Sequence, residues 1–149
     1  MSARALSRVF TIGYEGVTQP EFIACLRKSK VKILADVRAV PLSRRPGFSK
    51  NILAAGLREA GIDYVGFKAL GTPPEGRAAA RRNDLEALSR IYAGQLELPE
   101  AMAQAAMLRD LAEQRSVALL CFERAPACCH RSLLAQALFA DAEIVDLFP

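Results

Sequence analysis

Short apolar runs alternate with segments of helical periodicity along the whole chain. The runs lie at residues 9–12, 31–37, 62–65, 117–121 and 143–147, and helical patterns cover about 18–28, 49–60, 77–96, 99–113 and 130–139. The run at 31–37 is typical of a strand that is buried on both faces of a sheet. This alternation favours a mostly parallel β-sheet flanked by helices on both faces. We therefore expect a single α/β domain over residues 1–149.

The composition is that of a globular protein with a substantial core. The 149 residues are 52% hydrophobic and 24% charged, and no apolar run approaches the roughly 20 residues that cross a bilayer. The N-terminus has no apolar segment long enough for a secretory signal. We therefore expect a cytoplasmic protein with no membrane association, while its oligomeric state stays open. Because Cys128 and Cys129 are adjacent and Cys121 is close by, we expect reduced thiols.

Polar residues collect where three of the predicted strands end. In an open parallel sheet the ligand crevice lies beyond the carboxyl ends of the strands. Because these ends meet at one edge, the side chains after the first, second and fourth strands are expected to line one crevice. The predicted substrate-binding residues are Tyr14, Asp36, Arg38, Ser43, Arg44, Phe48, Ser49, Lys50 and Arg131.

The basic side chains of this crevice are arginines. The chain is arginine-rich, with 15 arginines among 20 basic residues, and arginine suits bidentate capture of phosphate or carboxylate. Arg38, Arg44 and Arg131 are expected to bind an oxyanion together with amides at helix starts. The alternative is ion pairing with Glu15, Asp36 and Glu123. The segment from Ser43 to Lys50 is interpreted as covering a substrate, and Tyr14 and Phe48 either stack on a base or sugar or roof the core.

Four residues are candidates for catalysis. Glu15, Glu123 and His130, which is the only histidine, are predicted general acids or bases. The rival role of His130 is structural, with its ring bonding backbone carbonyls of neighbouring loops. Cys129 near a helix start is a candidate thiolate nucleophile, although a small buried residue is the alternative. A zinc site at Cys121, Cys128, Cys129 and His130 is disfavoured because three consecutive ligands fit a tetrahedron poorly. No motif for a cofactor is recognised, so we predict neither a metal nor a cofactor.

Several of these motifs together resemble the DUF488 family of bacterial and archaeal proteins. They are Thr-Ile-Gly-Tyr-Glu-Gly at 11–16, Asp-Val-Arg at 36–38, the segment from Pro41 to Lys50, and Leu-Leu-Cys-x-Glu at 119–123 followed by Cys129-His130-Arg131. Gly61-Ile62-x-Tyr64 and Leu70-Gly71 are similar to the middle of the family. The resemblance covers nearly the whole chain and is weakest from Thr72 to Gln95. It implies the fold and the place of the site, not the reaction.

The leading hypothesis is an enzyme that hydrolyses or transfers a group on a phosphate-bearing substrate, such as a nucleotide or nucleic acid. Arginines would bind the anion, and Glu15, Glu123 or His130 would move the proton. One alternative is a non-catalytic module that binds nucleic acid or another anion. A second is a thiol-dependent redox or sulfur-handling protein that uses Cys129.

Overall fold

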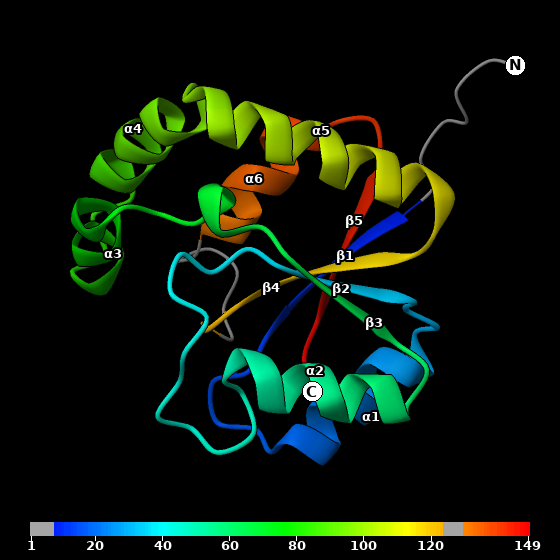
Figure 1. Ribbon diagram of the computed structural model, residues 1–149. Helices are drawn as coiled ribbons and strands as arrows, with labels where there is room; N and C mark the ends of the chain where they lie inside the picture. The colour runs from blue at the N-terminus through cyan, green and yellow to red at the C-terminus, as the bar shows by residue number, and fades with distance from the viewer. Residues whose placement is uncertain (1–7, 124–129) are drawn as a thin grey trace, which may run out of the picture.

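Five parallel strands form the centre of the protein in the order β3-β2-β4-β1-β5 (Figure 1). The computed structural model describes residues 8–123 and 130–149. Every residue of β2 and β4 is buried, whereas the edge strands β3 and β5 are partly exposed. This all-parallel sheet confirms the predicted fold class. The strands are β1 (Arg8–Gly13), β2 (Ile33–Asp36), β3 (Asp63–Gly66), β4 (Val117–Cys121) and β5 (Glu143–Leu147).

Helices cover both faces of the sheet, as Figure 1 shows. On one face, α1 (Gln19–Lys28) and α2 (Lys50–Glu59) bury Phe22 and Leu53 against Leu34 and Leu120 of the strands. On the other face, α5 (Pro99–Gln114) and α6 (His130–Leu138) pack on Leu119 and its neighbours. These two apolar layers are the single α/β domain that the sequence predicts.

The connection from β3 to β4 differs from the prediction. The pattern at 77–96 predicts one helix, but the structure has the 3₁₀ turn η1 (Lys68–Leu70), then α3 (Pro74–Arg81) and α4 (Leu85–Leu96). Asn83 has a positive φ of 58°, which ends α3, and the Asp84 carboxylate caps α4 by accepting from the Ala87 amide at 3.1 Å. Asparagine and aspartate are favoured at such positions because their side chains bond nearby amides. The break therefore has a local cause.

The order of the strands places the candidate site. β4 lies between β2 and β1. The chain leaves β1 and β2 toward α1 and α2 on one face, while it leaves β4 toward α6 on the opposite face. Adjacent strands whose connections diverge in this way leave a crevice at their carboxyl ends. Within the residues described, no helix has the length and apolar character of a membrane span.

Candidate functional site

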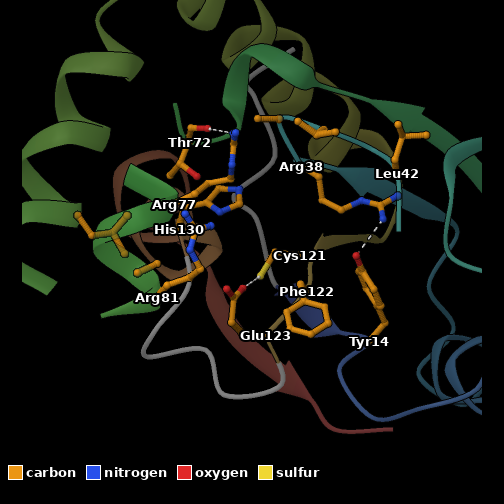
Figure 2. Close-up of a pocket in the computed structure, with 14 residues that line it drawn as sticks. Tyr14, Arg38, Leu42, Thr72, Arg77, Arg81, Cys121, Phe122, Glu123 and His130 are labelled. Atoms are coloured by element: carbon orange, nitrogen blue, oxygen red, sulfur yellow. Dashed lines mark hydrogen bonds between the residues drawn. The ribbon is translucent and has the colours of Figure 1, made fainter. Parts of the chain in front are cut away.

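A cavity of about 330 Å³ lies at the carboxyl ends of β1, β2 and β4 (Figure 2). Strand ends, the loop after β2, helix α3 and the start of α6 all contribute to it. Its size is at the lower end of the range for pockets that bind small molecules. The side chains that carry its chemistry are Tyr14, Arg38, Thr72, Arg77, Arg81, Cys121, Phe122, Glu123 and His130.

A buried ion pair fixes the side of the cavity that follows β2. Arg38 donates from Nε to Oδ1 of Asp36 at 2.8 Å and from Nη2 to Oδ2 at 2.7 Å. Its Nη1 donates to the Tyr14 hydroxyl at 3.2 Å and to the Phe48 carbonyl at 2.7 Å. Tyr64 of β3 donates its hydroxyl to Asp36. This network joins the ends of β1 and β2 to β3, so the predicted alternative of carboxylate pairing is confirmed at Arg38.

The network has clear electrostatic consequences. Burial opposes the charge on Arg38, but the hydrogen bonds and charge of Asp36 outweigh it, so the pKa of Arg38 is raised. Burial, followed by the bond to Asp36, raises the pKa of Tyr64. Arg38 thus keeps its positive charge at neutral pH. Most of the Arg38 donors are used within the protein, which limits its direct contact with a ligand.

Glu123 is the carboxylate that faces the cavity. It stands two residues after β4 and is half-buried. Burial raises its pKa, and the nearby charge of Glu15 raises it further, while backbone bonding and Arg131 oppose the shift. The cavity therefore contains a carboxyl group that holds its proton to a higher pH than usual, as general acids often do.

Close packing at Gly13 sets the position of Glu123. A Cβ atom at Gly13, the last residue of β1, would lie 1.9 Å from the Glu123 carbonyl oxygen and 2.7 Å from Nη1 of Arg131. Only glycine permits this approach without displacement. Arg131 is fully buried, and burial lowers its pKa against the opposing charges of Asp146 and Glu123. Arg131 thus supports the floor of the site rather than lining the cavity.

His130 begins α6 and is a neutral, buried side chain. Its Nε2 lies 2.7 Å from the Val37 carbonyl oxygen. Because a carbonyl only accepts, Nε2 carries the proton. The pKa of His130 is lowered to about 4, mainly by burial. The bond to Val37 opposes this shift, and the charge of Arg131 contributes to it. The ring also packs edge-on against Tyr92 at 5.4 Å. These contacts match the predicted rival role, in which the ring bonds a backbone carbonyl of a neighbouring loop.

Two arginines that the sequence analysis did not select also line the cavity. Arg77 and Arg81 are one turn apart on α3, in the stretch from Thr72 to Gln95 that carries the weakest family resemblance. Arg77 donates from Nη1 to the Thr72 carbonyl at 3.0 Å, and Arg81 is exposed. Their spacing of four residues, which places side chains on one helix face, was the available signal. Nothing in the sequence indicated that α3 folds over the strand ends.

Other predicted site residues lie away from the cavity. Arg44 and Lys50 are exposed and do not line it. The Ser49 hydroxyl accepts from the Ser43 amide at 3.0 Å and donates to the Ser43 carbonyl at 3.2 Å. The Ser49 side chain therefore ties the two ends of this loop together and forms no capping hydrogen bond with α2. Glu15 is exposed, and its amide donates to the Phe122 carbonyl at 2.9 Å. The structure therefore brings Tyr14, Arg38, Glu123 and His130 together in the cavity.

The cysteines divide into two kinds. Cys25 in α1 is a half-buried free thiol, and burial raises its pKa. Cys121 is buried at the end of β4, but it is disulfide-bonded, so the expectation of reduced thiols is wrong there. Whether two cysteines approach within bonding range depends on the fold rather than on their spacing in sequence. The predicted nucleophile Cys129 and its neighbour Cys128 lie outside the described residues.

Two further findings concern metal binding and the family of the chain. Across residues 8–123 and 130–149, no group of three His, Cys, Asp or Glu side chains is placed to hold a metal ion. The sequence profile of DUF488, a domain of unknown function, matches residues 18–138. The chain belongs to the DUF488 family. Comparison with curated proteins and with solved structures gives no match. In this DUF488 protein the matched region contains the ends of β2 and β4, with Arg38, Glu123 and His130.

Proposed function

We propose that the cavity is the active site of an enzyme that acts on a phosphate-bearing substrate, such as a nucleotide or nucleic acid. The observation that carries the proposal is the presence, in one cavity of about 330 Å³, of a carboxyl group with a raised pKa and three arginines. Arginines bind phosphate through charge-assisted hydrogen bonds, and a carboxyl group that keeps its proton can deliver it to a leaving oxygen.

Arg77 and Arg81 are the side chains assigned to the phosphate. Arg38 lines the same cavity, but Asp36, Tyr14 and Phe48 already engage most of its donors. Within the described part of the chain, no ion pair engages Arg81. The α3 arginines therefore supply the charge, because the charge of Arg38 is balanced by the Asp36 carboxylate.

Hydrolysis is the reaction that needs no co-reactant other than water. A water oxygen forms a new bond to phosphorus while the bond from phosphorus to the leaving oxygen breaks. Protonated Glu123 gives its proton to that leaving oxygen, and the proton lost by the attacking water returns to the Glu123 carboxylate. The products are an alcohol and a phosphate, and Glu123 ends in the state in which it began. The arginines stabilise the charge on the phosphoryl oxygens.

The test compares Glu123→Gln with the wild-type protein for turnover of a panel of phosphate esters and for binding of inorganic phosphate. We expect Glu123→Gln to retain phosphate binding and to lower turnover by about 10²- to 10⁴-fold. Glu97→Gln is the matched control, because Glu97 is exposed on the far end of α4 and does not line the cavity. Equal turnover in Glu123→Gln and wild-type protein would contradict the role of Glu123.

A binding module without chemistry is the second candidate, because the Asp36–Arg38 pair and neutral His130 hold much of the site rigidly. Such a module would bind phosphate ligands in the wild-type protein but turn over none of them. Its affinity for nucleic acid would fall steeply with salt, with a slope that reports the number of phosphates contacted. The same panel of ligands separates the two functions.

A further inference from the structure

Phe122 is an aromatic side chain that is exposed to solvent at the cavity. It directly follows β4, lines the cavity and is 45% exposed. Two other aromatic residues were predicted either to stack on a ligand or to roof the core, and both are buried, with Tyr14 3% and Phe48 0% exposed. Their rings stack on one another at 4.6 Å with an interplanar angle of 11°. Tyr14 and Phe48 therefore roof the core, and stacking on a ligand falls to Phe122.

The Phe122 ring is held from one side. It packs against Tyr14 at 5.3 Å in a nearly perpendicular arrangement of 80°, and Tyr14 is fixed by Phe48 and by the bond from Arg38. The loop after β2 adds Val40 and Leu42, which line the same cavity and are also exposed. Supported aromatic and aliphatic side chains exposed at a cavity mark an apolar binding wall.

The cationic side chains come from a different element. Figure 2 shows Arg77 and Arg81 of α3 on one side of the cavity, and Phe122, Tyr14 and Leu42 on the other. Glu123 and Cys121 lie between them in this view. The cavity is thus polarised, with a cationic wall and an aromatic wall. A ligand that fills it must carry an anion at one end and a planar apolar group at the other.

We propose that this ligand is a nucleoside monophosphate, with its base stacked on Phe122 and its phosphate bound by Arg77 and Arg81. The inference rests on the proposed function, which it narrows to one substrate class. A cavity of about 330 Å³ has room for one nucleotide rather than for several. Stacking on an aromatic ring is available to every base, so the site selects a nucleotide without selecting one base.

The experiment measures equilibrium binding by calorimetry for the four ribonucleoside monophosphates, ribose 5-phosphate, adenosine and a short single-stranded oligonucleotide. We expect each monophosphate to bind about 5- to 150-fold more tightly than ribose 5-phosphate, which is the range for stacking one base on an aromatic ring. Phe122→Ala should reduce the affinity for monophosphates to that for ribose 5-phosphate and leave the latter unchanged. Phe122→Trp should retain the difference.

Matched variants separate the two walls. Arg81→Ala should lower the affinities for monophosphates and for ribose 5-phosphate by the same factor. Arg90 is an exposed residue of α4 outside the cavity, so Arg90→Ala should change neither affinity. Phe148→Ala removes a phenylalanine that is 53% exposed but does not line the cavity, and it should leave all affinities unchanged.

The failures are distinguishable. If ribose 5-phosphate binds as tightly as the monophosphates and Phe122→Ala changes neither, the nucleotide assignment is overturned while the phosphate site remains. If the oligonucleotide binds with steep salt dependence and no monophosphate binds, the ligand is a nucleic acid and the assignment is again overturned. If no phosphate compound binds, both the assignment and the proposed function are wrong.

Discussion

Arg38 and Asp36 form a buried, two-point ion pair, with 2.8 Å between Nε and Oδ1 and 2.7 Å between Nη2 and Oδ2. Asp36 is the last residue of β2 and Arg38 follows two residues later, so the pair lies at the carboxyl end of this strand. Through Tyr14 the pair reaches the end of β1, and through Tyr64 it reaches β3. The ion pair that forms one wall of the cavity therefore also stabilises the sheet.

Removing one member of this pair should be strongly destabilising. Arg38→Met leaves the buried Asp36 carboxylate without its main partner, which typically costs about 3–5 kcal/mol of unfolding free energy. The double variant Arg38→Met with Asp36→Leu should recover part of the loss, because no lone charge is left buried. Urea unfolding of the single and double variants measures both values.

The control for this prediction is an exposed pair. Arg82 and Asp84 lie 3.4 Å apart with both side chains largely exposed, so Arg82→Met should change the unfolding free energy by about 0–1 kcal/mol. A similarly small change for Arg38→Met would show that the network at Asp36 does not depend on the ion pair.

The single histidine makes a second prediction easy to observe. Because burial lowers the pKa of His130 to about 4, its ring should remain neutral above pH 5, whereas it titrates near 6.5 in the unfolded chain. The unfolded state thus binds more protons between these values, and stability falls as pH drops from about 6.5 to 4. NMR titration of the only imidazole checks the pKa, and a midpoint near 6.5 would contradict the buried, bonded ring.

Glu123 should have the opposite effect on stability. Its pKa is raised by burial, so the folded state holds the proton more tightly than the unfolded state. Stability from Glu123 is therefore present below its unfolded pKa and is lost as pH rises through its folded pKa. Relative to the wild-type protein, Glu123→Gln should gain unfolding free energy across this window. Measuring both proteins by urea unfolding at several pH values tests the sign.

Two further variants sharpen the test of Glu123. Glu15→Gln removes a charge that raises the pKa of Glu123, so it should shift the Glu123 transition to lower pH. Glu97→Gln is the control, because it removes an exposed carboxylate outside the cavity. An equal gain in unfolding free energy in Glu97→Gln and Glu123→Gln would assign the effect to net charge rather than to burial.

The fold was largely predictable because each strand and helix carries its own local pattern. The buried runs at β2 and β4 are short-range signals that the structure confirms. The helical pattern from about residue 18 is confirmed as well, and the structure starts α1 with a capping box of Thr18 and Glu21. The break between α3 and α4 is also local, since it lies at Asn83 and Asp84, but the helical periodicity on both sides obscured it. Parallel pairing then followed from the alternation of elements.

The site was predictable only in part. The strand ends predicted that Tyr14, Arg38, Glu123 and His130 would lie together, and all four line the cavity, because a parallel sheet brings such ends to one edge. Arg77 and Arg81 were missed because the folding of α3 over that edge is a tertiary contact with no short-range signal. Solvent exposure has no short-range signal either, so the sequence left open whether Tyr14 and Phe48 stack on a ligand or roof the core. It also gave no sign that Phe122 is exposed at the cavity.

Gly13 provides a test of how tightly the strand ends must pack. A Cβ atom there would lie 1.9 Å from the Glu123 carbonyl oxygen, a contact that only displacement of the backbone after β4 can relieve. Gly13→Ala should therefore lower the unfolding free energy by about 1–3 kcal/mol, the usual result of overpacking, and should also lower turnover of phosphate esters by moving Glu123. Gly94→Ala is the matched control, because Gly94 lies within α4 with open space around its Cβ position. Alanine is the better helix former, so Gly94→Ala should raise the unfolding free energy by about 0.5–1 kcal/mol and leave turnover unchanged. Thermal unfolding and turnover assays on both variants measure these effects, and unchanged stability and turnover in Gly13→Ala would show that Glu123 does not depend on this contact.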